Sequence, residues 1–179
     1  RCAIAYANKK NIINIDTIFE AYDGVHKATV LDDELIEMQM KINSKIIKND
    51  YGLWVDTGSP HLIIETSNTD DIDVEKEGKL IRYSDNFREN GVNVNYVQKI
   101  SDEVFKIRTY ERGVEYETMA CGTGSTASAL CMNYLDKTTK NEIKMKCLGG
   151  DLIIKFQEKG KDLSLIHISE PTRRKHISY

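Results

Sequence analysis

Apolar and polar residues alternate along much of this chain, and this alternation is the main indication of its secondary structure. A period of two residues is typical of a strand that buries one face. The expected strands cover residues 25–30, 35–42, 93–100, 104–111, 142–147 and 151–156, and two more flank a Gly-Ser-Pro break within residues 53–64. Residues 142–147 and 151–156 lie on either side of Leu-Gly-Gly, so they are expected to form a hairpin.

Helices are expected at three places among these strands. Residues 1–9 carry an apolar side formed by alanines and an isoleucine, residues 79–89 are compatible with a short helix, and a longer helix follows Cys121. The order of elements shows no regular alternation of strand and helix. The chain is therefore expected to be a mixed α+β fold and not a doubly wound parallel sheet.

The composition is that of an ordinary globular protein. The 179 residues are 40% hydrophobic and 30% charged, with a net charge of −3, which gives no reason to expect nucleic acid or an anionic membrane as a partner. No apolar run approaches the roughly 18 residues of a membrane span. The four cysteines form no CxxC pair, so reduced thiols and a cytoplasmic location are expected.

The last residues, 163–179, do not continue the pattern that precedes them. The stretch LSLIHISEPTR closely resembles the translation of a transposase adapter end used in sequencing libraries. We therefore expect residues 163–179 to be a non-native tail outside the fold. The alternative is a natural flexible tail.

The stretch ETMACGTGSTASAL, residues 117–130, places a thiol where the chain turns into a helix. Gly122 and Gly124 allow a tight turn, and the unpaired N–H groups of the first helical turn suit a carboxylate or phosphate. The same field favours a thiolate, so the pKa of the Cys121 thiol is expected to be lowered. A site for acid–base or nucleophilic chemistry on a carboxylate compound is one interpretation.

A structural interpretation of the same residues stays open. A Gly-x-Gly before a helix is a weak signal, and a single cysteine is more often a buried core residue. A Walker-type phosphate loop is excluded because GxxxxGK[ST] is absent. A cysteine protease would need a histidine base, and nothing in the sequence links His26 or His61 to Cys121.

Four segments taken together carry a family resemblance. RTYERGVEYETMACGTGSTASAL, with DTGSPH and VNVNYV before it and LGGDLIIKF after it, resembles the diaminopimelate epimerase family. Related proline racemases share Cys-Gly-Thr-Gly but lack the ERG-V lead-in. The resemblance implies two similar domains, each a mixed, barrel-like sheet around a central helix. On that basis residues 1–41 are a remnant of the first domain and residues 42–162 a nearly whole second domain.

The resemblance also implies an activity. It predicts an isomerase that interconverts LL- and meso-diaminopimelate for lysine and peptidoglycan precursors, without a cofactor or metal. Two cysteines would face the substrate α-carbon, one removing a proton and the other delivering one. The expected partner is a small amino-acid substrate, and a homodimer is compatible with the family.

The resemblance assigns roles to five residues near the motif. Cys121 is implied to be the second catalytic cysteine. Gly122 and Thr123 are implied to bind the α-carboxylate, and Glu111 and Arg112 are implied to bind ammonium and carboxylate groups of the substrate. A surface ion pair after a strand is the structural alternative for Glu111 and Arg112.

Three further residues follow from the upstream motifs. Asn93 of VNVNYV matches the family's substrate asparagine, although an asparagine there is otherwise typical of a strand edge or turn. His61 of SPH matches a histidine near the site, with a buried structural histidine as the alternative. Ser59 stands where many members have asparagine and is expected near the site.

Departures from the family pattern limit the expected activity. The first catalytic cysteine would lie six residues before Cys2 and is not in this sequence. The chain is therefore expected to be an inactive fragment. The lead-in ERGVEYET is one residue longer than usual, near Tyr116. Two alternatives remain, a sister racemase or isomerase acting on another carboxylate substrate and a non-catalytic carboxylate-binding module.

Overall fold

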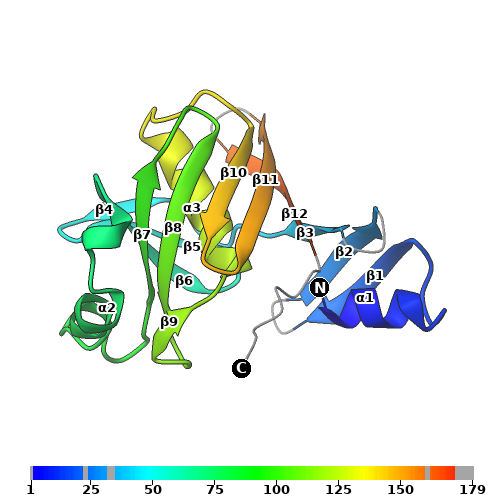
Figure 1. Ribbon diagram of the computed structural model, residues 1–179, viewed down its shortest axis with the longest axis horizontal. Helices are drawn as coiled ribbons and strands as arrows, with labels where there is room; N and C mark the ends of the chain where they lie inside the picture. The colour runs from blue at the N-terminus through cyan, green and yellow to red at the C-terminus, as the bar shows by residue number, and fades with distance from the viewer. Residues whose placement is uncertain (1, 22–23, 32–34, 160–161, 172–179) are drawn as a thin grey trace.

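The described part of the chain folds into a single mixed sheet with helices inside and outside its curve (Figure 1). The computed structural model describes residues 2–21, 24–31, 35–159 and 162–171. Its helices are α1 (Cys2–Lys9), η1 (Thr69–Asp71, a 3-10 turn), α2 (Val74–Arg82) and α3 (Gly122–Tyr134). Its strands are β1 (Asp16–Ala21), β2 (Gly24–Val30), β3 (Leu35–Met40), β4 (Ile47–Asn49), β5 (Gly52–Asp56), β6 (Pro60–Glu65), β7 (Asn93–Lys99), β8 (Val104–Glu111), β9 (Tyr116–Thr118), β10 (Glu142–Cys147), β11 (Gly150–Lys159) and β12 (Asp162–Pro171).

The sheet is both parallel and antiparallel. Its strand order is β1-β2-β3-β12-β11-β10-β8-β7-β6-β5-β4, with β9 paired to β8. The pairs β6–β7 and β8–β10 are parallel, whereas the other paired strands are antiparallel. This arrangement confirms the α+β prediction.

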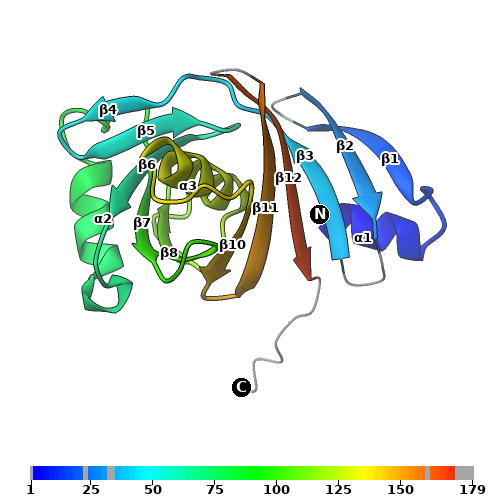
Figure 2. The ribbon, with the colours of Figure 1, turned by 90° about the horizontal axis from the view of Figure 1, so that it is seen from above.

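Helix α3 lies inside the curve of the sheet, as Figure 2 shows. Its residues from Gly124 to Met132 are all buried, and most of them are small, so the surrounding strands can approach the helix from every side. The core around it draws residues from β5 to β8, β10 and β11, among them Phe105, Leu130 and Ile154. The predicted helix after Cys121 is thus confirmed, as the central element of the fold.

Helix α2 packs on the outer face of β7 and β8. Leu62, Tyr96 and Tyr110 form a second core beneath it. Asp73 caps the helix by accepting a hydrogen bond from the Lys76 N–H. The predicted helix at 79–89 is therefore wrong in position, since the cap at Asp73 sets the start and the helix ends at Arg82.

Gly78 allows α2 to lie close to the sheet. A Cβ at this position would lie 2.5 Å from the Cβ of Tyr110. A glycine in mid-helix lowers helix propensity. Here the missing side chain makes room for an aromatic ring.

The N-terminal elements form a smaller unit with its own core. Helix α1 packs on β2, and Ile4, Ala28 and Ile36 are its buried centre. The predicted helix at residues 1–9 is confirmed from Cys2 onward, whereas β1, β4 and β9 were not predicted. The division at residue 41 stays a prediction.

Strand β12 joins this unit to the rest of the sheet. It pairs antiparallel with β11 on one side and with β3 on the other. Residues 163–171 lie within β12 and so belong to the sheet, contrary to the expectation that they lie outside the fold. The physical reason is that β3 and β11 both offer an unpaired backbone edge that a further strand can fill. The non-native origin of residues 163–179 stays a prediction, and residues 172–179 are outside the described range.

A buried ion pair fixes the hairpin formed by β8 and β9. Arg108 donates from Nε and Nη2 to the Glu117 carboxylate, at 2.7 and 2.6 Å. Its remaining terminal nitrogen donates to the backbone oxygens of Thr69 and Ile72, at 2.8 and 2.9 Å. The side chains are only 18% and 11% exposed, so this pair is screened little by solvent.

We expect Glu117→Ala to lower the free energy of unfolding by about 2–3 kcal/mol, because it leaves the Arg108 guanidinium without its counter-ion. Denaturant unfolding measures the change. The matched control is Glu103→Ala, which breaks an ion pair with Lys140 whose side chains are 62% and 49% exposed. That variant should leave the free energy of unfolding nearly unchanged, because solvent screens an exposed pair. Equal effects in the two variants would contradict the argument.

Candidate functional site

The candidate site lies where three neighbouring strands meet the start of α3. β6 and β7 begin here, with His61 opposite Asn93, and β8 ends here at Glu111. Along β8, Phe105 and Ile107 belong to the core around α3. Side chains alternate along a strand, so Thr109 and Glu111 lie on that same face.

Cys121 is the N-cap residue of α3, with an extended backbone (φ −127°, ψ 113°). Its sulfur accepts a hydrogen bond from the Gly124 N–H at 3.4 Å and lies 3.4 Å from the Thr123 hydroxyl oxygen. The side chain is buried but not sealed, with 8% of the residue's surface exposed. The Cys121 thiol therefore lies at the N-terminus of α3, as the sequence predicted.

The pKa of this thiol differs from the sequence-based prediction. Burial raises the pKa of Cys121 above its ordinary value, and the negative charge of Glu111 raises it further. Hydrogen bonds from Thr123 and Gly124 act in the opposite direction. The expected lowering is therefore wrong, because the loss of hydration outweighs the helix N-terminus.

His61 is completely buried and lies next to Thr123. Its Nε2 is 2.9 Å from the Thr123 hydroxyl oxygen. Burial lowers the pKa of His61 to about 3, and the nearby charge of Arg112 lowers it further. The imidazole is therefore neutral at physiological pH.

Asn95 is a site residue that the sequence analysis missed. Its amide nitrogen lies 3.1 Å from His61 Nδ1, and it donates to the backbone oxygens of Leu62 and Asn93 at 3.1 and 3.3 Å. The Thr109 hydroxyl donates to its Oδ1 at 3.0 Å. The signal was available, because the motif VNVNYV places two asparagines two residues apart and hence on one face of a strand.

Helix α3 can approach Asn95 only because residue 124 has no side chain. A Cβ at Gly124 would lie 2.5 Å from Asn95 Oδ1 and 3.2 Å from the Cε1 atom of His61. The second glycine of the motif is thus required for close packing between the helix start and the strands. The sequence analysis assigned no substrate-binding role to Gly124.

Asn93, Ser59 and Arg112 form the neighbouring part of the site. The Asn93 amide nitrogen donates to Ser59 Oγ at 2.9 Å, and its Oδ1 accepts from the Arg112 backbone N–H at 2.8 Å. The Arg112 guanidinium donates to the Asn90 backbone oxygen at 2.7 Å and lies 3.5 Å from Ser59 Oγ. These three predicted residues are therefore brought together.

The longer lead-in before Cys121 folds as a hairpin turn between β8 and β9. Glu115 occupies it with φ of +60°, and Gly113 with φ of +89°. The Glu115 carboxylate accepts from the Gly113 N–H at 3.1 Å and from the Tyr110 hydroxyl at 3.2 Å. These two hydrogen bonds stabilise the left-handed backbone conformation of Glu115, which residues with a side chain rarely adopt.

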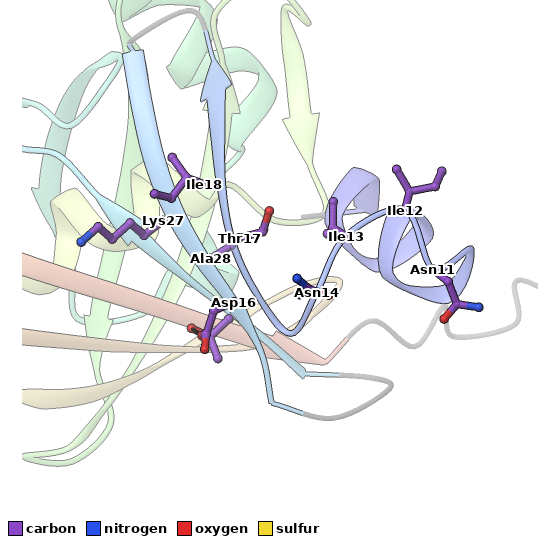
Figure 3. Close-up of a pocket in the computed structure, with 10 residues that line it drawn as sticks. Asn11, Ile12, Ile13, Asn14, Asp16, Thr17, Ile18, Lys27 and Ala28 are labelled. Carbon is purple, nitrogen blue, oxygen red and sulfur yellow. Dashed lines mark hydrogen bonds between the residues drawn. The ribbon is translucent and has the colours of Figure 1, made fainter.

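A hollow of about 570 Å³ borders this part of the site. Among its lining residues are Ser59 and Arg112, together with Trp54 and Phe87. A second hollow of about 720 Å³ lies between the segment after α1 and strands β1 and β2, as Figure 3 shows. It contains none of the predicted site residues.

Within the described residues, no group of three or more His, Cys, Asp or Glu side chains could hold a metal ion. No helix in the described part of the chain is long and apolar enough to cross a membrane.

Comparison with known sequences decides the family. The family model described as diaminopimelate epimerase matches residues 53–173. The chain belongs to the diaminopimelate epimerase family. The diaminopimelate epimerase of Flavobacterium psychrophilum is 42% identical over 171 residues, covering 96% of this chain and 67% of the relative. The Aquifex aeolicus diaminopimelate epimerase is 34% identical over 175 residues, covering 92% of this chain and 63% of the relative.

Solved structures confirm the diaminopimelate epimerase-like fold. A hydroxyproline epimerase from Agrobacterium vitis superposes with a TM-score of 0.65 at 15% identity, covering 94% of this chain and 62% of the other. A PhzF-family phenazine biosynthesis protein from Bacillus anthracis superposes with a TM-score of 0.67 at 12% identity, covering 95% and 71%. The fold therefore supports several chemistries, and the activity must be argued from the site.

Proposed function

We propose that this chain provides one acid–base cysteine and most of the substrate site of a cofactor-independent diaminopimelate epimerase. The observation that carries the proposal is the position of Cys121. It caps α3, hydrogen-bonds to Thr123 and Gly124, and lies within the electrostatic reach of Glu111. These are the surroundings that proton transfer next to a carboxylate needs.

The helix start suits the carboxylate of the substrate. The N–H groups in the first turn of α3 include those of Gly122 and Thr123, and a helix N-terminus attracts an anion. When the α-proton leaves, negative charge develops on this carboxylate. Donors already held in place then lower the barrier most in a site that excludes water.

Cys121 exchanges the proton. In its neutral form, which burial favours, the thiol gives its proton to the α-carbon and becomes a thiolate. In the reverse direction the thiolate takes the α-proton and the S–H bond re-forms. The bonds from Thr123 and Gly124 stabilise the thiolate form, so both directions are accessible to one residue.

Epimerisation also needs a second acid–base group on the opposite face of the α-carbon. Cys131 is completely buried in the core around α3. Cys147, on β10, contacts Ser125 of α3. Cys2 is exposed on α1. The described hydrogen bonds of the Cys121 sulfur go to Thr123 and Gly124, so we assign the second group to the part of the relatives that this chain does not match.

Glu111, Arg112, Asn93 and Ser59 are proposed to bind the remaining polar groups of the substrate. The carboxylate of Glu111 suits an ammonium group, and the planar guanidinium of Arg112 suits a carboxylate. Binding would require Arg112 to exchange its bond with the Asn90 backbone oxygen for one with the substrate.

The test is a chimera that joins this chain to the unmatched part of the Flavobacterium psychrophilum relative. In deuterated water, we expect the chimera to invert diaminopimelate with incorporation of deuterium at the α-carbon. The 179-residue chain alone should give no inversion. Inversion by the chain alone would refute the two-group mechanism, and a folded chimera without turnover would refute the epimerase proposal.

A further inference from the structure

The orientation of the Asn95 side chain follows from its neighbours. Its amide nitrogen faces two backbone oxygens, those of Leu62 and Asn93, which can only accept hydrogen bonds. Its Oδ1 faces the Thr109 hydroxyl. The reverse orientation would place an oxygen against two carbonyl oxygens, so the NH₂ group must point this way.

This orientation selects the tautomer of His61. The same NH₂ group lies 3.1 Å from His61 Nδ1 and shares its two hydrogens among this nitrogen and the two backbone oxygens. An amide nitrogen cannot accept a hydrogen bond, so Nδ1 is the acceptor. A neutral imidazole carries one proton, which then resides on Nε2. Nε2 lies 2.9 Å from Thr123 Oγ1, and it therefore donates to the hydroxyl oxygen.

The direction of the bonds continues to the sulfur. Since the Thr123 oxygen accepts from His61, its own hydrogen is free to point at Cys121 Sγ, 3.4 Å away. We propose that Asn95 is a positioning residue that holds His61 as the Nε2–H tautomer and so directs the Thr123 hydroxyl hydrogen to the Cys121 sulfur. The line Asn95–His61–Thr123–Cys121 is called the relay below. Its importance for catalysis rests on the proposed function.

The groups around Cys121 differ in whether they favour its thiolate form. From β8, the Glu111 carboxylate disfavours the thiolate, and from α3 the Gly124 N–H favours it. His61, on β6, is neutral and contributes no charge. The positive charge of Arg112 lowers the pKa of His61. The Thr123 hydroxyl is the largest favourable contribution to the thiolate, so its direction decides how far the effect of burial is offset.

The tautomer can be observed directly in the 179-residue chain. NMR chemical shifts of the histidine ring nitrogens distinguish a protonated nitrogen from an unprotonated one, and the His61→Gln variant identifies the signals of His61. We expect Nδ1 unprotonated and Nε2 protonated, unchanged between about pH 5 and pH 8. A proton on Nδ1, or an imidazolium, would overturn the proposal.

The coupling to sulfur is measured by titrating the ultraviolet absorbance of the Cys121 thiolate, taken as the difference between each protein and its Cys121→Ser counterpart. Thr123→Val should move the midpoint up by about one pH unit, because the sulfur loses a hydrogen bond to its charged form. Thr123→Ser keeps the hydroxyl and should restore the original midpoint. Equal midpoints for the valine and serine variants would overturn the proposal.

Asn95→Leu tests the positioning role itself. Without the NH₂ group, Nε2 can become an acceptor and draw the Thr123 hydrogen away from the sulfur, so the midpoint should rise by up to about one pH unit. The matched control is Thr57→Val, which removes another buried hydroxyl that bonds to the Thr123 backbone oxygen at 2.9 Å but lies outside the relay. Its midpoint should stay unchanged.

A double variant separates the relay from a general loss of structure. If Asn95 acts through Thr123, Asn95→Leu should add nothing to the shift caused by Thr123→Val. Additive shifts, or a Thr57→Val shift as large as that of Asn95→Leu, would overturn the proposal. These readouts need no turnover, so an inactive chimera with the expected tautomer refutes the epimerase proposal alone, and an active chimera with the opposite tautomer refutes the relay alone.

Discussion

Replacing the Cys121 thiol by a hydroxyl in the chimera should lower the turnover of diaminopimelate by about three orders of magnitude. A serine hydroxyl is a far weaker acid than a thiol, so it can neither release its proton to the α-carbon nor be regenerated as a base near neutral pH. The substitution removes only the acidity of one atom and retains a polar group of similar shape. The measurement is the rate of inversion in deuterated water.

Substrate binding should survive this change. The helix N-terminus and Arg112 are unaffected, so the dissociation constant for diaminopimelate should stay within the same order of magnitude. Cys147→Ser is the matched control, since this half-buried thiol on β10 lies 3.5 Å from the Ser125 hydroxyl oxygen. It should keep its turnover, and a Cys121→Ser chimera that also keeps its turnover would exclude proton transfer by this residue.

The buried His61 should make the 179-residue chain sensitive to acid. Its pKa is about 3 in the folded chain, against about 6.5 in an unfolded one. Because the folded pKa is lower, the unfolded state takes up the proton first as the pH falls below about 6.5. The penalty grows down to about pH 3 and is on the order of 3 kcal/mol at about pH 4.5.

His61→Gln isolates this effect from the titration of carboxylates. The variant loses the relay contacts and should be less stable near neutral pH. Its free energy of unfolding should nevertheless fall less steeply than that of the unsubstituted chain between about pH 6.5 and pH 4. Denaturant unfolding at each pH gives the two curves. Parallel curves would show that His61 is protonated in the folded chain or is not buried in it.

The elements that the sequence predicted well are those whose two faces differ. Along 104–111 and 142–147, buried and exposed residues alternate, and both segments are strands. Strand β1 was missed because its pattern is almost wholly exposed, and Ile18 within it is 66% exposed. Strand β7 was found because apolar and polar residues alternate along 93–100, although its first five residues are buried on both faces.

The site divides in the same way. A linear motif shows which residues lie next to one another in the chain, and so it indicated Cys121, Thr123 and Arg112. It cannot show which side chains from separate strands face one another, and Asn95 became visible only when β6 and β7 were paired in register. The pKa of Cys121 was predicted in the wrong direction because a motif carries no information on burial.

The position of β12 between β3 and β11 has a consequence for how the molecule is made. Leu35 of β3 pairs with Pro171 of β12, so every residue between these two strands must leave the ribosome before this pairing can form. Until then β3 lacks its neighbour on that side, and pairings between such distant segments fold slowly.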